Sequence, residues 1–387
     1  MGYRIGIVGA GIGGLAAAAL LAARGHQVTL AERFSSPRAI GSGLVVQPAG
    51  LAVLDAVGAG RAARAYGAPL TRMIGHAGGR RVLDVRYRPQ APGLAMHRAS
   101  LFGVLWDCVQ ATDTRISTGA AVTGAQAGWL QRQDAPDLGP FDLIVDASGT
   151  GSVLSPLQAR PLGFGAVWAS VPWPDTPLRR DQLTQRYHRA SRMAGVMPIG
   201  CLPGDPTPRA AVFWSQSEAE ARAWAGADFA AWKAAAAAFW PDFAAFTATL
   251  TKADLTQARY SHGTLAKPHA DGIAFIGDAA HRASPQLGQG ANMALLDAVA
   301  LAVALKDGLP GALPRYAATR RWHRQFYQAF SAMMTPMYQS DSHWLPVVRD
   351  WGLAPLARLP VIRGILTALV SGDVLPPLAG QVWPRTL

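Results

Sequence analysis

The chain of 387 residues is poor in cysteine and in charge. Only Cys108 and Cys201 are present, with no CxxC pair and no Cys/His cluster, so the sequence argues against a disulfide framework, a structural metal and a redox-active dithiol. Charged residues make up 16% and hydrophobic residues 50%, a balance that argues against disorder. We therefore expect a folded protein with a large core and no metal site, in a reducing cytoplasm.

The charges that are present are unequal in sign. Lysine and arginine number 36 against 24 acidic residues, which gives a formal net charge of +12. Such an excess favours an anionic ligand, an acidic partner or a membrane surface. We expect no nucleic-acid partner.

The N-terminal stretch combines apolar runs with regularly spaced glycines. Residues 3–8 predict a buried strand, 9–14 a tight turn and 15–24 an alanine-rich helix, and "HQVTLAER" predicts a second strand. The order strand, glycine-rich turn, helix, strand is typical of a dinucleotide-binding unit, with an acid, Glu32, at the end of the second strand. No second GxGxxG is present, so the sequence predicts one such unit.

Each position of this motif has a physical role. Gly9 permits the sharp turn, Gly11 lets the backbone approach a pyrophosphate, and Gly14 lets helix and strand pack closely. The helix N-terminus presents free amides to the anion, and Glu32 would accept hydrogen bonds from the adenosine ribose. The expected cofactor-binding residues here are Gly9, Gly11, Ile12, Gly13, Gly14, Glu32 and Arg33.

A second junction, "GDAAHRASPQLGQGANMALLDAVAL", indicates which dinucleotide is held. A strand ends at Asp278, whose carboxylate suits the hydroxyls of a linear sugar chain. Pro285 stiffens the turn, and Gly288 and Gly290 allow the backbone to approach a flat ring. The amides and positive dipole end of the helix predicted over 291–305 would stabilise a reduced isoalloxazine. The junction therefore indicates a flavin.

Together with "HRASLFGVL" at 97–105, these motifs closely resemble the group A FAD-dependent aromatic hydroxylases, the family of para-hydroxybenzoate and ubiquinone-pathway hydroxylases. The resemblance covers about residues 3–330. It implies that Asp278 binds the FAD ribityl chain, that 288–292 lie against the flavin pyrimidine and that Arg98 contacts the cofactor. The residues implied are Arg98, Asp278, Pro285, Gly288, Gly290, Ala291 and Asn292.

One segment departs from this family. Where the family has an Asp-Gly pair followed by an arginine, this chain has Ser148-Gly149 and Ser155, and Asp146 falls two residues too early. The family aspartate supports both flavin and NAD(P)H binding, so the departure implies less efficient use of nicotinamide. The D-A-S-G form resembles branches that contain flavin halogenases and prenyl reductases, although the halogenase W-x-W-x-I-P signature is missing.

The middle of the chain predicts a second sheet that covers a planar apolar substrate. Strands such as "GAVWASVPW", "RMAGVMPIGC" and "AAVFWSQ" alternate aromatic and small residues, and the alanine-rich segment 217–246 predicts helices over that sheet. Core packing accounts for the aromatic residues equally well. The candidate substrate-binding residues are Trp168, His188, Phe213 and Trp214.

The segment after Pro314 is helical in pattern, apolar and dotted with arginines. Arg349, Arg358 and Arg363 could meet phospholipid headgroups beside an apolar face, as a peripheral membrane contact. The alternative is a helical cap on the flavin domain, because no stretch here has the ~20 uninterrupted apolar residues needed to span a bilayer.

These observations lead to an α/β fold with a single Rossmann-like FAD-binding domain, an inserted mixed β-sheet substrate domain and a helical C-terminal segment. We assign 1–70, 95–162 and 265–310 to the first, 71–94 and 163–264 to the second, and 311–387 to the third.

The expected function is that of an FAD-dependent monooxygenase that inserts one oxygen atom of O2 into an aromatic or electron-rich small molecule through a flavin C4a-hydroperoxide. NAD(P)H would be the reductant, and FAD would supply the chemistry. No catalytic side chain is assigned, because no motif fixes a titratable residue beside the flavin. Two alternatives stay open: a flavin-dependent reductase or dehydrogenase of a prenyl or quinone-like lipid, and a non-catalytic or partner-modifying flavoprotein.

Overall fold

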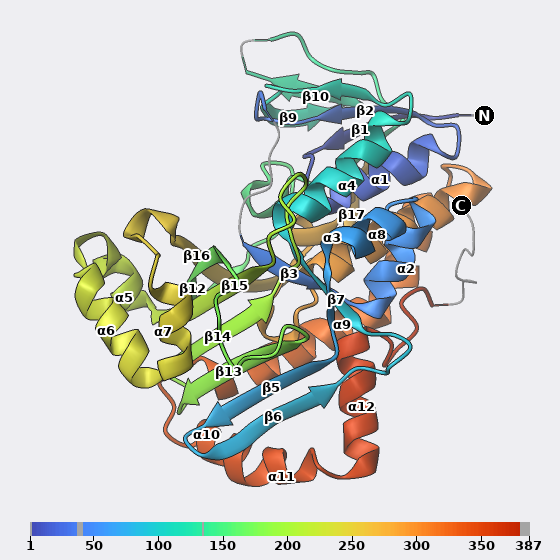
Figure 1. Cartoon of the computed structure of the whole chain (residues 1–387). Helices are drawn as coiled ribbons and strands as arrows, with labels where there is room; N and C mark the ends of the chain where they lie inside the picture. The colour runs from blue at the N-terminus through green and yellow to red at the C-terminus, as the bar shows by residue number, and fades with distance from the viewer. Residues whose placement is uncertain (1, 37–41, 134, 380–387) are drawn as a thin grey trace.

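The computed structural model describes residues 2–36, 42–133 and 135–379 and confirms the predicted α/β fold class (Figure 1). A six-stranded sheet lies at the centre of the nucleotide-binding part, and all its strands are parallel except β17 at one edge. Its strand order is β17 (His269–Ala270), β18 (Ile273–Phe275), β11 (Leu143–Asp146), β1 (Arg4–Val8), β2 (Gln27–Ala31) and β8 (Arg115–Ser117).

Helix α1 (Ile12–Ala22) packs between α8 (Gly290–Ala304) and α4 (Arg98–Gln110). Nine of its residues, from Gly13 to Leu21, are buried, so α1 forms part of the largest apolar core. The helix begins three residues earlier than the sequence predicts. A Cβ at Gly13 would lie 3.3 Å from Cβ of Ala294, so glycine there allows α1 and α8 to approach closely. Helices α2 (Pro48–Ala56) and α3 (Gly60–Tyr66) extend this layer.

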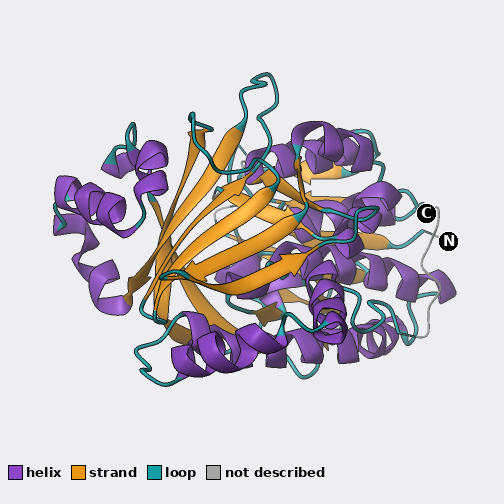
Figure 2. Cartoon of the chain, turned by 60° about the horizontal axis from the view of Figure 1, so that its bottom comes forward, coloured by secondary structure: helices purple, strands orange, loops and turns teal. Residues whose placement is uncertain are grey.

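A second, mixed sheet of eight strands lies beside the first, and Figure 2 shows it as a broad twisted layer. Helices α5 (Glu218–Ala223), α6 (Phe229–Phe239) and α7 (Pro241–Thr247) cover one face, where the sequence predicts helices. The strand order is β19 (His281–Arg282), β16 (Thr256–Thr264), β12 (Arg160–Pro172), β15 (Arg209–Ser217), β14 (Arg192–Pro198), β13 (Gln182–His188), β5 (Arg72–Ala77) and β6 (Arg80–Arg86).

The two faces of this sheet have different neighbours, because successive side chains on a strand point to opposite faces. Val167 and Trp214 pair across β12 and β15 and pack under α6 and α7. Trp168 and Phe213 pair next to them and point to the other face, toward the C-terminal helices and the nucleotide-binding part. The second face is therefore covered by the C-terminal helices and not by α6 and α7.

Two small sheets complete the β-structure. Strands β3 (Gly43–Val46), β7 (Gly93–His97) and β4 (Ala68–Leu70) form one, and β9 (Val122–Gln126) with β10 (Trp129–Arg132) forms the other. A Cβ at Gly43 would lie 2.3 Å from Cγ2 of Ile199, so β3 runs directly over the second face of the large sheet. The three-stranded sheet thus joins the two main parts.

The C-terminal part is helical, as the sequence predicts. It contains α9 (Ala312–Tyr338), α10 (Leu345–Val347), a π-helical turn (Val348–Leu353), α11 (Ala354–Leu356) and α12 (Pro360–Ser371), and residues 380–387 lie outside the described chain. Among the described helices none is long and apolar enough to cross a membrane alone. Leu345–Leu356 and Pro360–Ser371 reach that length and apolarity only together, and they are bent by 111°.

Arg349 does not reach a lipid headgroup in this structure, which corrects the sequence-based expectation. Its side chain is buried, with Nε donating to Asp350 Oδ1 at 2.6 Å and one terminal nitrogen donating to the Met337 carbonyl at 2.9 Å. The guanidinium also lies over the rings of Tyr187 and Tyr338. A single sequence does not distinguish such a core arginine from the exposed Arg358 and Arg363.

Candidate functional site

The glycine-rich turn joins β1 to α1, and its three motif glycines differ in what surrounds them. Gly9 has a φ of +99°, and a Cβ there would lie 2.7 Å from the Ala147 carbonyl oxygen. A Cβ at Gly14 would lie 1.9 Å from the Gly9 carbonyl oxygen. At Gly11 the nearest heavy atom, the Ala147 oxygen, would be 3.9 Å away. The protein itself therefore requires glycine at 9 and 14, whereas Gly11 leaves room in front of the α1 N-terminus.

Glu32 braces this turn. Its carboxylate is buried and accepts hydrogen bonds from the backbone N–H of Ala10 at 2.7 Å and of Phe34 at 3.0 Å. The sequence predicts only the ribose-binding role, which the remaining lone pairs could still serve. Arg33 beside it is exposed and lies over the Phe34 ring, 4.7 Å from the ring centre.

The second junction consists of short turns that lead into α8. Asp278 is exposed on the 3₁₀ turn Gly277–Ala279. Pro285 is the first residue of a second 3₁₀ turn, Pro285–Leu287, which the Ser284 hydroxyl caps at its N-terminus. Gly288 is left-handed, at φ 60° and ψ 30°, so only glycine fits there without strain. Gly290 starts α8, and a Cβ there would meet open space. The first amides of this helix are thus available to an anion.

Asn292 was predicted to contact the cofactor, but its side chain is directed into the protein. It is fully buried, and its Oδ1 accepts from the Gln47 backbone N–H at 2.7 Å. Its Nδ2 donates to the carbonyl oxygens of Val45 and Gly288, at 3.2 and 3.1 Å. The side chain therefore fixes the left-handed Gly288 against β3.

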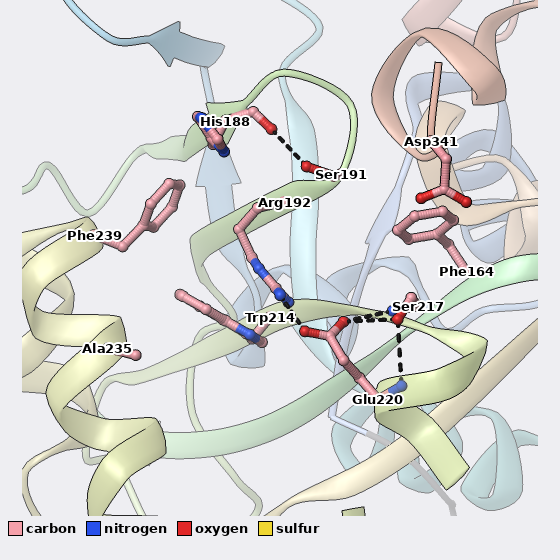
Figure 3. A pocket seen from close by; sticks show the side chains of 10 residues that line it. All are labelled: Phe164, His188, Ser191, Arg192, Trp214, Ser217, Glu220, Ala235, Phe239 and Asp341. Carbon is pink, nitrogen blue, oxygen red and sulfur yellow. Dashed lines mark hydrogen bonds and ion pairs between the residues drawn. The ribbon is translucent and has the colours of Figure 1, made fainter. Parts of the chain in front are cut away.

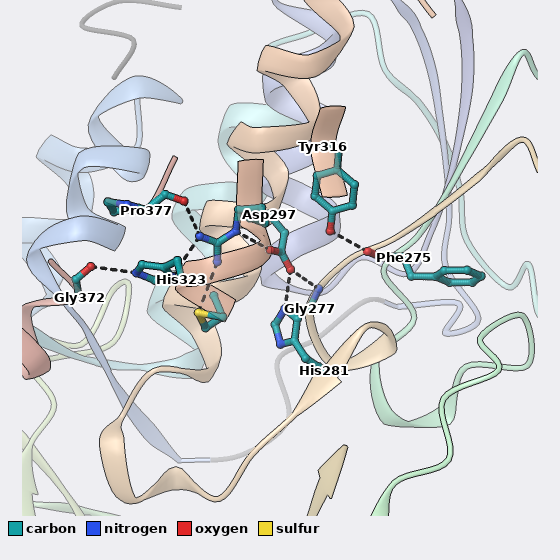
Figure 4. A network of polar contacts seen from close by, with 10 residues as sticks. Phe275, Gly277, His281, Asp297, Tyr316, His323, Gly372 and Pro377 are labelled. Atoms are coloured by element: carbon teal, nitrogen blue, oxygen red, sulfur yellow. Dashed lines mark hydrogen bonds and ion pairs between the residues drawn. The ribbon is translucent and has the colours of Figure 1, made fainter. Parts of the chain in front are cut away.

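A buried ionic network centred on Asp297 holds the Asp278 turn through the Gly277 backbone (Figure 4). The fully buried Asp297 carboxylate accepts from Gly277 N–H at 3.0 Å, His281 Nε2 at 2.6 Å and Arg320 Nε at 2.9 Å. Burial alone would raise the pKa of Asp297, but His281 and Arg320 outweigh it and hold the pKa far below its usual value. Asp297 is therefore a charged anchor for the backbone that carries Asp278.

The network continues to the C-terminal segment through His323. Its Nδ1 accepts from Arg320 at 3.2 Å, and its Nε2 donates to the Gly372 carbonyl at 3.0 Å. Burial, with Arg320 adding to it, lowers the pKa of His323 to about 3. The ring is therefore neutral at physiological pH, as these two bonds require. His323 therefore links Arg320, and through it Asp297, to the Gly372 backbone at the end of α12.

Asp278 and Tyr260 both lie near Arg98. Arg98 begins α4, as predicted, and is exposed although protein atoms surround much of its side chain. The surrounding protein lowers the pKa of Arg98, whereas Asp278 and Tyr260 lie close enough to raise it. Neither Arg98 nor Asp278 has a side-chain hydrogen-bond partner among residues 2–36, 42–133 and 135–379. These free polar groups, with the α8 amides and the open space at Gly11 and Gly290, fit FAD.

Tyr260, which contacts Trp168, is a candidate site residue that the sequence reasoning did not name. Trp168 Nε1 donates to its hydroxyl at 2.9 Å, and the Trp168 ring lies against Phe213 with ring centres 4.6 Å apart. Burial raises the pKa of Tyr260 to about 12, although Trp168 and Arg98 act to lower it. Its place on β16, which pairs with β12, is set by a distant strand pairing, so no local motif signals it.

Trp214 and His188 lie elsewhere. Trp214 packs edge-on against Trp232 and Phe239 in the core under α6. His188 is exposed where β13 ends. Both line a pocket of about 550 Å³ beside α5 and α6 that contains the Arg192–Glu220 ion pair and none of the cofactor candidates (Figure 3). Of the four substrate candidates, the structure brings only Trp168 and Phe213 to the face near Arg98.

The departure at Ser148 has a structural basis. The buried Asp146 carboxylate accepts from the Ser148 hydroxyl at 2.5 Å and from its backbone N–H at 3.0 Å, and Ser152 donates to the other oxygen. The Ser155 hydroxyl, which stands where the family has arginine, donates to the Ala279 carbonyl at 2.5 Å. This turn is thus organised around an internal acid and neutral hydroxyls.

We expect Asp278→Ala to weaken FAD binding by about 10- to 100-fold, because it removes a charged hydrogen bond worth roughly 1.5–3 kcal/mol. The folded protein should keep its stability, since the Asp278 carboxylate is exposed. Titration of apoprotein with FAD, followed by flavin fluorescence, measures the affinity. Asp271→Ala, another exposed acid six residues before the turn's start, is the matched control. Unchanged affinity in Asp278→Ala would remove this residue from the site.

Comparison with known proteins adds independent observations. The model of the FAD binding domain family matches residues 3–127 and 149–324. The 2-heptyl-3-hydroxy-4(1H)-quinolone synthase of Mycobacteroides abscessus is 30% identical over 317 residues, 78% of this chain and 81% of that protein. The 6-methylpretetramide 4-monooxygenase of Streptomyces rimosus is 27% identical over 95% of this chain and 92% of its own length. Klebsiella pneumoniae HpxO, solved with FAD and uric acid, superposes with a TM-score of 0.80 at 20% identity, over 96% of this chain and 98% of its own.

Proposed function

Because this chain belongs to the FAD binding domain family and is an FAD-dependent monooxygenase, we propose that it hydroxylates a planar, electron-rich aromatic molecule held between the flavin and the large sheet. The observation that carries the proposal is that Asp278 and Tyr260 both lie near Arg98, while Trp168 donates a hydrogen bond to the Tyr260 hydroxyl. Relatives named for a quinolone and a pretetramide support an aromatic substrate.

The residues have distinct roles in this proposal. FAD, when bound, supplies the electron transfer and the activation of O2. Glu32 would accept from the adenosine ribose, Asp278 would accept from the ribityl hydroxyls, and the Gly11 backbone would leave room for the pyrophosphate. The first amides of α8, backed by the helix dipole, would stabilise negative charge on a bound flavin. The side chains thus bind and orient both molecules.

Tyr260 is proposed to orient the substrate. Its oxygen already accepts a hydrogen bond from Trp168, so its own proton remains free to donate. With its pKa raised to about 12, the phenol keeps that proton throughout the neutral range. The Trp168 and Phe213 rings supply an apolar wall for a flat ring. A substrate with an aromatic ring and one hydrogen-bond acceptor suits this arrangement.

NAD(P)H is the proposed reductant, and the balanced reaction takes substrate, O2, NAD(P)H and a proton to hydroxylated product, NAD(P)+ and water. We retain the division into an FAD-binding part, an inserted substrate part and a C-terminal part at the boundaries predicted from the sequence. We also propose a cytoplasmic enzyme that touches a membrane only peripherally, through its C-terminal part.

An isotope experiment tests the reaction. Purified protein, FAD, NAD(P)H and candidate aromatic substrates are incubated under ¹⁸O2, and product masses are measured. We expect the product to gain one labelled oxygen atom, with heat-denatured protein as the control. A product with two hydrogens added or removed and no label would instead identify a reductase or dehydrogenase.

A further inference from the structure

The C-terminal part carries most of the exposed apolar side chains of the described chain. Nine of the thirteen large apolar residues that are exposed lie between Trp344 and Ile365. Within 351–365 every residue is exposed except Ala354, Ala357 and Ile362. Monomeric proteins seldom leave such a contiguous apolar surface without a partner. We call residues 351–365 the C-terminal apolar surface.

The charges on this surface have one sign. Arg358 and Arg363 are its only charged residues, and both are exposed. The neighbouring acid, Asp350, is paired with the buried Arg349. On the adjoining strand β6, Arg80 lies over the Trp351 ring, 3.6 Å from its centre. An apolar surface with arginines and a tryptophan at its border matches a lipid bilayer with anionic headgroups.

The shape of the segment also suits an interface rather than a span. The helical stretches Leu345–Leu356 and Pro360–Ser371 are bent by 111° relative to each other. The turn between α11 and α12, where Leu359 and Val361 are exposed, lies at the outer edge of the molecule (Figure 1). A bent pair of short helices places its apolar side chains at the depth of the headgroup and upper acyl region, while the arginines reach the phosphates.

We propose that the C-terminal apolar surface docks the enzyme on an anionic phospholipid leaflet. This inference rests on the peripheral membrane contact proposed above and is independent of the hydroxylation reaction. Helix α12 connects this surface to the core near Trp168, because its inner side chains Leu366 and Val370 pack in the same apolar cluster as Trp168. Gln289, which precedes α8, donates to the Val370 carbonyl at 3.0 Å. Helix α12 thus carries part of the docking surface at one end and contacts the Trp168 cluster and Gln289 at the other.

Vesicle sedimentation tests the proposal with the FAD-loaded protein. Vesicles contain either phosphatidylcholine alone or phosphatidylcholine with 30% phosphatidylglycerol, a composition of about one anionic lipid in three. We expect the native protein to bind the anionic vesicles at least about tenfold more tightly than the neutral vesicles. Salt at 0.5 M should reduce that binding, because it shortens the screening length about threefold relative to about 0.05 M salt. Val361→Asp with Ile365→Asp should lower binding at least about tenfold.

Arg358→Glu with Arg363→Glu should lower anionic-vesicle binding by about 30-fold or more, because each arginine at an anionic surface contributes about fivefold. The matched control is Arg61→Glu with Arg115→Glu, which changes the same charge at exposed sites elsewhere, and Trp322→Asp is the apolar control. FAD content and NAD(P)H oxidation are measured for every variant in lipid-free buffer, so a failed hydroxylase is distinguished from failed docking.

Three outcomes would overturn the proposal: no sedimentation of the native protein, equal binding to both vesicle types, or unchanged binding of Val361→Asp with Ile365→Asp. Light scattering gives a further decisive result. If the native protein is a stable dimer that this double variant converts to a monomer, the surface is covered by a second copy of the chain rather than by lipid.

Discussion

Asp297→Ala is expected to lower the free energy of unfolding by about 3–5 kcal/mol, because it leaves a buried guanidinium without its acid. Arg320 is fully buried, and its Nε has Asp297 as its partner. Loss of the carboxylate also frees the Gly277 N–H, which it holds at 3.0 Å. Urea unfolding of the apoprotein near pH 7 measures the change. The pH matters because the depressed pKa of Asp297 makes its contribution complete above the ordinary value of 3.8 and lost on acidification below it.

The control for this substitution is Asp307→Ala, an exposed acid just beyond α8, which should change stability by less than about 0.5 kcal/mol. Asp297→Asn should fall between the two, since the amide keeps the shape and one acceptor oxygen but not the charge. If Asp297→Ala were as stable as the native protein, the network would not anchor the Asp278 turn.

Gly14→Val and Gly11→Ala should separate folding from cofactor binding. A side chain at 14 would place its Cβ 1.9 Å from the Gly9 carbonyl, so β1 or α1 must shift. We expect a loss of about 3 kcal/mol or more, together with loss of FAD. Gly11→Ala should cost only about 0.5–1 kcal/mol, the cost of a poorer N-cap, yet should bind FAD far more weakly because its methyl group occupies the approach of the pyrophosphate.

Urea unfolding of the apoprotein and FAD titration read the two effects independently. Gly226→Ala, where a Cβ meets open space, is the matched control for adding one methyl group. Equal losses of stability in Gly14→Val and Gly11→Ala, or normal FAD affinity in Gly11→Ala, would contradict the distinct roles assigned to these glycines.

The elements that local patterns encode could be predicted from the sequence. The strand predicted over 3–8 is β1, at Arg4–Val8, and the helix predicted over 291–305 is α8, at Gly290–Ala304. The helix predicted from residue 15 begins at Ile12 instead. Glycine is unfavourable inside helices, so local pattern alone predicts that the turn continues to Gly14. In the structure Gly13 and Gly14 lie in the first turn of α1, because a side chain at 13 would meet Ala294 and one at 14 would meet the Gly9 carbonyl.

The parts of the site that depend on distant pairing could not be predicted. Alternation along β15 shows that Phe213 and Trp214 point to opposite faces, but only the packing of α6 and α7 reveals which face is covered. Tyr260 meets Trp168 only because β16 pairs with β12. Asn292 belongs to the family-like motif, yet its side chain bonds to Gln47 and Val45, which lie 245 and 247 residues away in sequence.

The close packing of α1 against α8 has a consequence for synthesis of the chain. Helix α1 ends at Ala22, and α8 begins at Gly290, so roughly 270 residues separate the two halves of one apolar interface. At roughly 5–20 residues per second, the ribosome needs on the order of 15–50 s to make that interval. During this time, the face of α1 that α8 later covers has no native partner. The nascent chain is therefore a natural client for chaperones that hold apolar helices, and any fragment that stops before Ala304 should aggregate.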